Sequence, residues 1–286
     1  MTDIQQLLQR LITRSEQSHK GDFGSLVVVL GDESMKGASI LAALSALCMG
    51  LGKVQIFAQQ SVGEQINIIY PDIIVYQAST DVQSSFEQCI KQSGCTAVLI
   101  GPGLGQEDAS AQLLETVLQV TQTKRLPIAL DAGALTQQCV SSCKHFADDH
   151  VVLTPHPGEF KRLFPALADS YAPTNEARRA CLTQAVSTFN QVVVLKGAAT
   201  LVASRHFFYV CDKGNATMAV AGMGDVLSGM IAALLARGFV ATEAAQLGVY
   251  LHALAGDIAA EDLGVSLKAS DMMSYIPKAI QAAIRL

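Results

Sequence analysis

The sequence predicts an α/β fold with a mainly parallel central sheet flanked by helices on both faces. Short apolar runs rich in β-branched residues recur along the chain, and most alternate with stretches typical of a helix. Runs that are continuously apolar, rather than alternating, indicate strands buried on both faces of a covered parallel sheet. Apolar residues make up 50% of the 286 residues, which suffices for a sizeable core. No linker rich in Pro, Gly or Ser divides the chain, so we expect a single domain over residues 1–286.

The elements follow from this pattern in chain order. Six runs are predicted to be strands, namely 25–30, 53–58, 96–100, 127–131, 151–154 and 191–196. Two closely spaced runs then predict a hairpin, with strands over 199–204 and 206–210. The Ala- and Leu-rich stretch 37–51, the stretches between the later strands and the chain after the hairpin predict helices over 37–51, 107–122, 132–140, 158–164, 174–189, 225–237, 241–261 and 270–285.

Composition excludes several classes of protein. The net charge of −5 and a pI of about 5.7 argue against a nucleic-acid-binding surface. The apolar stretch 38–52 is too short for a membrane-spanning helix, which needs ~20 residues, and the start of the chain has no secretory signal pattern. Seven scattered cysteines without a CxxC pair fit reduced thiols in the cytoplasm, and the spacing of Cys139 and Cys143 alone does not indicate a metal site. The low charged fraction of 16% suggests surface hidden in an oligomer.

The segment 214–238 is the strongest candidate for chemistry. Its glycines Gly222 and Gly224 stand immediately before a predicted amphipathic helix, and Asp225 begins that helix. Backbone amides at a helix start, together with the helix dipole, form an anion hole that suits a transferring phosphoryl group. Asp225 beside this hole is a candidate base for an attacking hydroxyl. The plain structural interpretation is an N-cap aspartate with packing glycines.

Four further loops follow apolar strands. GPGLGQ (101–106) has three glycines that allow a close backbone approach to a ligand, or simply a tight turn. TPHPGEF (154–160) holds His156 between two prolines, and Glu159 complements the amino end of the helix after it. LKGAAT (195–200) places Lys196 at a strand end, where a cation reaches a nucleotide phosphate, with the Thr200 hydroxyl nearby. With GDESMKGAS (31–39) after the first strand, these loops together indicate an enzyme acting on phosphate-bearing substrates.

The ordered motifs resemble those of the ADP/ATP-dependent NAD(P)H-hydrate dehydratase family, which belongs to the ribokinase-like superfamily. The resemblance runs from SHKGDFGSLVVVLG (18–31) through GPGLG, PIALDAGAL (127–135), LTPHPGEF and VVLKGAAT to AGMGDVLSGMIAALLARG (221–238). The GxGD aspartate is common to the superfamily, whereas LTPHPGE and DAGAL distinguish the dehydratase branch. The resemblance implies a ribokinase-like fold and the repair of hydrated NADH or NADPH.

The implied reaction uses ADP or ATP with Mg²⁺ to phosphorylate the ring hydroxyl of the S-form hydrate, after which phosphate leaves. By the resemblance, Asp225 is the base, and the amides of Gly222 and Gly224 hold the phosphoryl group. The nucleotide would contact Lys196, Gly197, Ala198, Ala199, Thr200 and Gly224, and the hydrate would contact Ala38, Gly103, His156 and Asp225. Asn215 would orient the glycine-rich loop or the metal-bound phosphates. No protein metal ligand is assigned.

Family habit further implies a homo-oligomer such as a homotetramer, and it favours ADP as the donor. The first expected strand begins at residue 25, so we expect a separate epimerase to handle the other stereoisomer of the hydrate. Three departures stand out: Thr217 replaces a common glycine, Val220–Ala221 replace a Thr-Gly pair, and Met35 replaces an aromatic residue. The second departure makes the loop before GMGD bulkier and stiffer than usual. We expect this to affect the reaction rate and not the assignment to the family.

Two other functions remain open at this point. One is a ribokinase-like kinase of a small hydroxylated metabolite, such as a thiazole or a hydroxymethylpyrimidine, which would use the same Asp225 and anion hole. The other is a non-catalytic module that senses NAD(P)H or ADP, against which the intact GMGD sequence (222–225) argues. LTPHPGE with DAGAL favours the dehydratase over the kinase.

Overall fold

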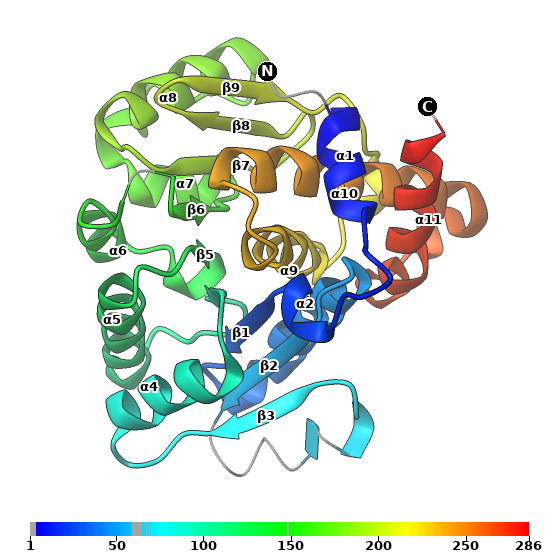
Figure 1. The fold of residues 1–286 in the computed structure, drawn as a ribbon. Coiled ribbons are helices and arrows are strands. Elements are labelled where there is room, and N and C mark those ends of the chain that lie inside the picture. Colours follow the sequence, from blue (N-terminus) through cyan, green and yellow to red (C-terminus); the bar gives the residue numbers. More distant parts are fainter. Residues whose placement is uncertain (1–3, 59–64, 67, 148, 286) are drawn as a thin grey trace.

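A computed structural model describes residues 4–58, 65–66, 68–147 and 149–285. Within these ranges, nine strands form one sheet in the order β3-β2-β1-β4-β5-β6-β7-β8-β9 (Figure 1). Strands β1 to β7 are parallel, and β8 and β9 add an antiparallel hairpin at one edge. The strands are β1 (Ser25–Val29), β2 (Lys53–Ala58), β3 (Ile74–Gln77), β4 (Ala97–Ile100), β5 (Ile128–Leu130), β6 (Val151–Leu153), β7 (Val192–Leu195), β8 (Leu201–Ser204) and β9 (Phe207–Val210).

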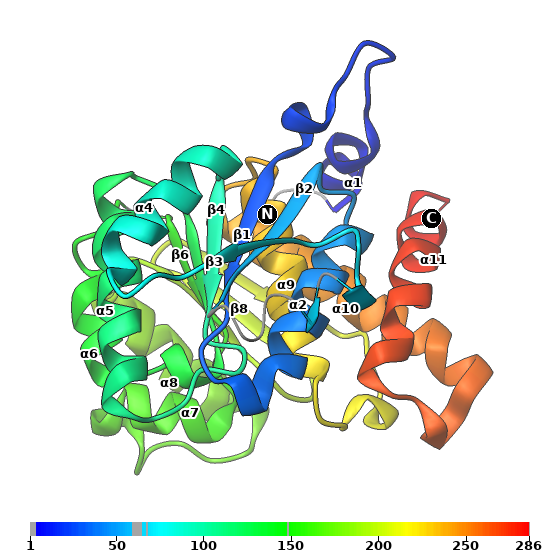
Figure 2. The same cartoon turned by 90° about the horizontal axis from the view of Figure 1, so that it is seen from below.

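Helices cover both faces of the sheet, as Figure 2 shows. One face carries α1 (Ile4–Ile12), α2 (Lys36–Cys48), α9 (Met223–Ala236), α10 (Ala241–Leu263) and α11 (Met272–Ile284). The other carries α4 (Val82–Ser93), α5 (Asp108–Thr123), α6 (Gln137–Cys143), α7 (Pro157–Leu163) and α8 (Asn175–Thr188). Successive side chains of β1 alternate between the two cores, with Val28 in the first and Val29 in the second, both fully buried. The predicted parallel α/β architecture is therefore confirmed.

Several predicted boundaries and one predicted helix character were wrong. The helix expected over 132–140 is a 3-10 turn (Ala132–Ala134) followed by α6, because Thr136 accepts a hydrogen bond from the Cys139 amide and caps α6. Helix α9 begins at Met223, two residues earlier than expected. It is buried on nearly all sides rather than amphipathic, because α2 and α10 pack over it. The helix expected over 270–285 begins at Met272 after a separate 3-10 turn.

The order of the strands creates a switch point between β1 and β4. The chain passes from β1 to β2 on one side of β1, whereas β4 lies on the other side. The loops that follow the neighbouring strands β1 and β4 therefore leave the sheet in opposite directions. Ligands of open parallel sheets bind in such a crevice, beyond the carboxyl ends of the strands. The two loops contact each other here, where the Asp32 amide donates to the Gly103 carbonyl at 2.8 Å. None of the described helices has the length and apolar character that a membrane crossing requires.

Candidate active site

The first turn of α9 holds the residues predicted to form the anion hole. Gly222 is the N-cap of α9 and has a φ of +91°, and no side chain caps the helix there. A side chain at this position would also collide, since a Cβ would lie 2.7 Å from Leu41 Cδ1 and 2.8 Å from Ala269 Cβ. The helix itself offers no acceptor to the amides of Gly224 and Asp225, so both are available to an anionic ligand.

Asp225 lies in this first turn and is partly buried. Burial raises the pKa of Asp225 to about 7, and the negative charges of Asp131 and Glu159 act in the same direction. Lys196 opposes the rise in pKa but does not cancel it. A carboxylate whose pKa is near 7 is a much better proton acceptor than an ordinary aspartate. Such a strongly shifted group beside an anion hole is typical of a functional site.

Lys196 connects three of the loops. Its Nζ donates to Asp131 Oδ1 at 2.8 Å and lies 3.8 Å from Glu159 Oε2. The side chains of Asp131 and Glu159 are only 1% and 6% exposed, so these are buried ion pairs. Burial alone would lower the pKa of Lys196, but the carboxylates of Asp131, Glu159 and Asp225 outweigh burial and raise it. The lysine is therefore charged, and it is held at one place by the two loops that follow β5 and β6.

The same lysine lies beside the anion hole. A Cβ built on Gly224 would lie 3.2 Å from Lys196 Nζ and 4.0 Å from Asp131 Oδ2. A free helix amide, a fixed cation and a proton acceptor thus meet at one point. This arrangement can stabilise the charge on a transferring phosphoryl group while a neighbouring hydroxyl loses its proton.

His156 is the N-cap of α7 and has a fixed ring orientation. Its Nδ1 accepts hydrogen bonds from the amides of Gly158 and Glu159, at 3.0 and 3.3 Å. The Glu159 side chain in turn contacts His156. Its Oε2 accepts a hydrogen bond from the His156 amide at 2.7 Å, and its Oε1 lies 3.4 Å from His156 Nε2. Because Nδ1 is an acceptor, the neutral ring carries its proton on Nε2, and 53% of the side chain is exposed to a ligand.

The loop over 196–200 is rigid. Gly197 and Ala199 have φ values of +139° and +51°. Arg178 of α8 donates to the Ala198 carbonyl, and the Thr200 hydroxyl donates to the Gly197 carbonyl at 2.9 Å. The backbone is thus shaped before any ligand binds, as a nucleotide cradle requires.

The remaining predicted residues lie around this centre. Ala38 is in the first turn of α2, and its neighbour Ser39 donates to the Pro102 carbonyl at 2.8 Å, which brings Ala38 next to the loop of Gly103. Asn215 caps the 3-10 helix Ala216–Met218, and its side chain is occupied by contacts within the protein. Thr217, where the family commonly has glycine, adds a hydroxyl hydrogen bond to Asn215 Oδ1. Val220 and Met35 are 36% and 43% exposed.

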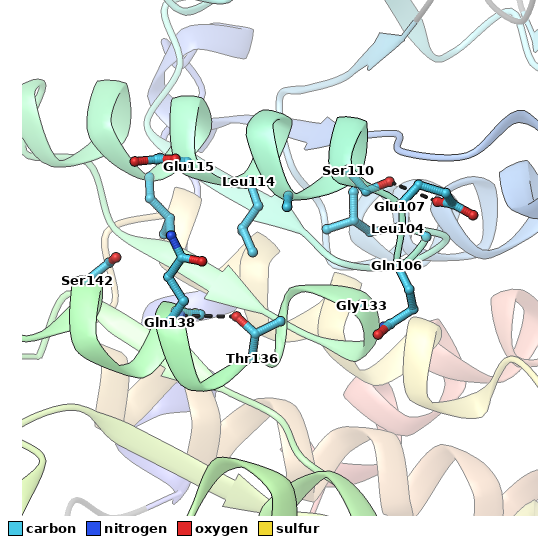
Figure 3. Close-up of a pocket in the computed structure, with 14 residues that line it drawn as sticks. Leu104, Gln106, Glu107, Ser110, Leu114, Glu115, Gly133, Thr136, Gln138 and Ser142 are labelled. Carbon is cyan, nitrogen blue, oxygen red and sulfur yellow. Dashed lines mark hydrogen bonds between the residues drawn. The ribbon is translucent and has the colours of Figure 1, made fainter.

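A cavity near these loops lies on their other side, between α5 and α6 (Figure 3). It has a volume of about 110 Å³, and Leu104, Gly105 and Gly133 from the glycine-rich loops form part of its wall. Asp225, Lys196 and His156 do not line it. Cys139 does, and its Sγ lies 3.8 Å from that of Cys143, with both thiols buried. This cavity is adjacent to the reactive centre but separate from it.

Sequence reasoning predicted that Glu159 complements the start of α7, as its capping contact with His156 confirms, but it gave no role at the reactive centre to Asp131, Glu159 or Arg178. Asp131 and Glu159 stood inside recognised motifs, but their pairing with Lys196 needs the fold to bring three strand ends together. Arg178 comes from a polar helix far along the chain. The one usable signal was Asp131, because an acidic residue directly after a buried strand lies at the ligand-binding edge of a parallel sheet.

Comparisons with known proteins show which family the sequence matches. The sequence model of a family described as NAD(P)H-hydrate dehydratase matches residues 26–278. The chain is 37% identical over 263 residues to the ADP-dependent (S)-NAD(P)H-hydrate dehydratase of Neisseria meningitidis, covering 88% of this chain and 83% of that one. It is 34% identical over 282 residues to the Bifunctional NAD(P)H-hydrate repair enzyme Nnr of Escherichia coli, covering 98% of this chain but 52% of that one. The chain thus spans about half the length of that bifunctional relative.

Solved structures of related proteins also match this chain. The ADP/ATP-dependent NAD(P)H-hydrate dehydratase of Bacillus subtilis, co-crystallised with ATP and Mg²⁺, matches with a TM-score of 0.80 at 28% identity. The match covers 98% of this chain and 97% of that one. A ribokinase-like superfamily protein of Enterococcus faecalis shares the fold, with a TM-score of 0.82 at 24% identity.

Proposed function

This chain belongs to the NAD(P)H-hydrate dehydratase family, and on that basis we propose that it uses ADP or ATP to return the (S)-hydrate of NADH or NADPH to the reduced cofactor. It is a lyase that repairs nicotinamide cofactors. The observation that supports this most strongly is the position of Asp225, whose pKa is raised to about 7, beside the amides that open α9 and beside Lys196.

The chemistry explains why a kinase-like site serves a dehydratase. Hydroxide is a poor leaving group, so the ring hydroxyl is first converted into a phosphate ester. Asp225 takes the proton of this hydroxyl while the hydroxyl oxygen attacks the terminal phosphorus of the nucleotide. The phosphorus–oxygen bond to the nucleotide breaks, and the amides of Gly222 and Gly224 with Lys196 stabilise the transferring group. Phosphate then leaves with the electrons of the ring carbon–oxygen bond, and the ring nitrogen lone pair assists this departure. Loss of a proton from the adjacent carbon restores the double bond.

We assign the binding roles to the residues around this centre. The nucleotide lies along Lys196, Gly197, Ala198, Ala199 and Thr200 and reaches Gly224, while the hydrate contacts Ala38, Gly103, His156 and Asp225. Asn215 supports the glycine-rich loop. Mg²⁺ would enter with the nucleotide, bound mainly by its phosphates and by water.

The decisive experiment mixes the protein with (S)-NADH hydrate, Mg²⁺ and either ADP or ATP, and follows the near-ultraviolet absorbance of reduced nicotinamide. We expect recovery only when a nucleotide is present, faster with ADP. Folded protein that gives no recovery with either nucleotide would contradict the function. A stable phosphorylated alcohol formed from a vitamin precursor would instead identify a small-metabolite kinase.

Three features of its setting are also proposals. The low charged fraction of 16% favours a homo-oligomer such as a homotetramer, which size-exclusion chromatography with light scattering would test. All seven cysteines are free thiols, which fits a reducing compartment, so we place the chain, as one catalytic domain, in the cytoplasm. Because the relatives are named for the (S) form, an epimerase activity for the other stereoisomer would work alongside it.

Asp131 should set the pH at which the enzyme works. Only the ionised form of Asp225 accepts a proton, so kcat/KM for the hydrate should fall as pH drops through about 7. Replacing Asp131 by Asn removes one repelling charge and frees Lys196 to attract Asp225, and both changes lower the pKa of Asp225. In Asp131→Asn the acid limb of the pH profile should therefore move to lower pH. An unmoved acid limb would mean that another group controls it.

His156 should matter for the hydrate more than for the nucleotide. Its exposed Nε2 is held in place by Glu159, whereas the nucleotide cradle over 196–200 belongs to a different loop. We expect His156→Ala to raise KM for the hydrate about 10-fold, the loss of one to two hydrogen bonds, with little change in the Kd of ADP. His206→Ala, at an exposed position in the β8–β9 turn, is the matched control. If KM for the hydrate did not change, His156 would serve only as the N-cap of α7 and would not bind the hydrate.

A further inference from the structure

The glycine-rich loop before α9 is fastened to α10. Asp257 of α10 accepts two hydrogen bonds from the start of this loop, one from the Gly214 amide at 3.0 Å and one from Asn215 Nδ2 at 2.9 Å. Asn215 Nδ2 also donates to the carbonyl of Gly256 at 3.1 Å. Both carboxylate oxygens of Asp257 are thus used to hold the loop.

Packing reinforces the same attachment. A Cβ built on Gly256 would lie 2.1 Å from the Met218 sulfur, so the Met218 side chain of the loop rests directly on the helix at Gly256. A Cβ on Gly214 would lie 3.5 Å from that of Ala253 on the same face of α10. The loop therefore sits against the helix over at least one full turn.

Backbone hydrogen bonds in a series of short turns connect Asn215 to the anion hole. The Met218 amide donates to the Asn215 carbonyl at 3.2 Å, and the Val220 amide donates to the Met218 carbonyl at 2.9 Å. The Met223 amide then contacts the Val220 carbonyl at 3.4 Å, directly after Gly222. Each turn leaves little freedom to the next, so a displacement at Asn215 reaches Gly222.

Helix α10 also contacts the far end of the loop. His252 lies one turn before Gly256 on α10, is 9% exposed and interacts with the backbone of Met223. Burial lowers the pKa of His252 to about 4, so the ring is neutral at pH 7. One face of α10 therefore supports both the beginning and the end of the segment that contains Gly222.

We propose that Asp257 is a positioning residue, whose two hydrogen bonds to Gly214 and Asn215 hold the loop so that the amides of Gly222 and Gly224 face the transferring phosphoryl group. This inference rests on the proposed function. Asp257 touches neither substrate, and its effect passes through the loop.

The first test is Asp257→Asn, which preserves shape but replaces one acceptor oxygen by a donor facing another donor. We expect kcat for NADH hydrate with ADP to fall between about 10-fold and 100-fold, because a misplaced catalytic group of this kind costs that much. The Kd of ADP should change far less than kcat, because Gly224 is the one assigned nucleotide contact near the displaced loop and the other assigned contacts lie in the 196–200 loop. Glu261→Gln, one turn further along α10 and exposed, makes the same change in charge and should behave as wild type.

An exchange of the two side chains separates the hydrogen bonds from the charge. In the double variant Asn215→Asp/Asp257→Asn, the amide at position 257 donates to the carboxylate at position 215 and still accepts from the Gly214 amide. The carboxylate at 215 still accepts from the Thr217 amide, as Asn215 does now, but it cannot donate to the Gly256 carbonyl. Asn215→Asp alone loses the same bond and also sets two carboxylates against each other, so it should lose activity. The double variant should therefore be more active than Asn215→Asp alone.

Hydrogen exchange gives a readout that does not depend on activity. The amides of 214–218 should exchange faster in Asp257→Asn and slow again in the double variant, whether or not a substrate is present. A kcat within twofold of wild type in Asp257→Asn, or a double variant no better than the worse single one, would overturn the proposal. A fall in kcat matched by an equal loss of ADP affinity would also overturn it. If the wild-type protein did not turn over the hydrate, the proposed function would be contradicted instead. The exchange rates would still test whether Asp257 holds the loop through Gly214 and Asn215.

Discussion

Asp225→Asn should abolish most turnover while leaving the nucleotide bound. The change keeps the shape of the side chain and removes its ability to accept a proton from the ring hydroxyl. General-base catalysis contributes between about 100-fold and 10,000-fold, and the raised pKa of Asp225 places it well for that role. We therefore expect kcat to fall about 1,000-fold, measured as the recovery of reduced-nicotinamide absorbance at saturating ADP, with an unchanged Kd for ADP by calorimetry.

The control for this variant is Asp169→Asn, which makes the same chemical change at an exposed position after α7. It should retain wild-type activity. If Asp225→Asn kept activity within about 10-fold of wild type, less than the smallest usual effect of a general base, Asp225 would not be the base.

Asp225→Asn should also alter how stability depends on pH. The native state holds the Asp225 proton up to about pH 7, whereas the ordinary pKa of an aspartate is 3.8. The stability that this proton contributes is complete below pH 3.8 and is lost as pH rises through about 7. An asparagine has no such loss. The melting temperature of the variant relative to wild type should therefore be higher at pH 8 than at pH 4.

Of the described strands, the sequence predicted all but β3, which lies at one edge of the sheet. Continuous apolar runs such as 25–30 and 191–196 are strands because both of their faces are covered. Strand β3 escaped prediction because it is an edge strand whose first and last residues are exposed, which removes the apolar signal. Helices α1 and α4 were also missed, because each carries only a few buried apolar residues among polar ones: Leu7, Leu8 and Leu11 in α1, and Phe86, Cys89 and Ile90 in α4.

The candidate site divides in the same way. Gly222, Gly224 and Asp225 were predictable because their chemistry is local, in that a helix start supplies amides and its first turn supplies the carboxylate. The ion pairs of Lys196 were not predictable, since Asp131 and Glu159 are separated from it in sequence and meet it only because parallel strands end at one edge. Charge pairing between loops is a property of the fold rather than of any motif.

Because of that pairing, loss of Lys196 should strongly reduce the stability of the fold. Lys196→Met keeps the length of the side chain but leaves the carboxylates of Asp131 and Glu159 buried without a cation. Removing one partner of a buried pair costs about 3–5 kcal/mol, because the remaining charge lacks both water and a counter-charge. We expect a loss of that size in the free energy of unfolding at pH 7, measured by urea denaturation.

Two comparisons show whether the loss comes from uncompensated charge. Lys91→Met, at an exposed position in the last turn of α4, should change the free energy of unfolding by less than about 0.5 kcal/mol. The double variant Lys196→Met/Asp131→Asn removes a stranded carboxylate together with its lysine, so it should be more stable than Lys196→Met alone. If it were less stable, the contribution of Lys196 would be packing of its aliphatic stem rather than neutralisation of Asp131. In wild type this charge pairing persists through neutral pH, because the carboxylates raise the pKa of Lys196 above 10.5.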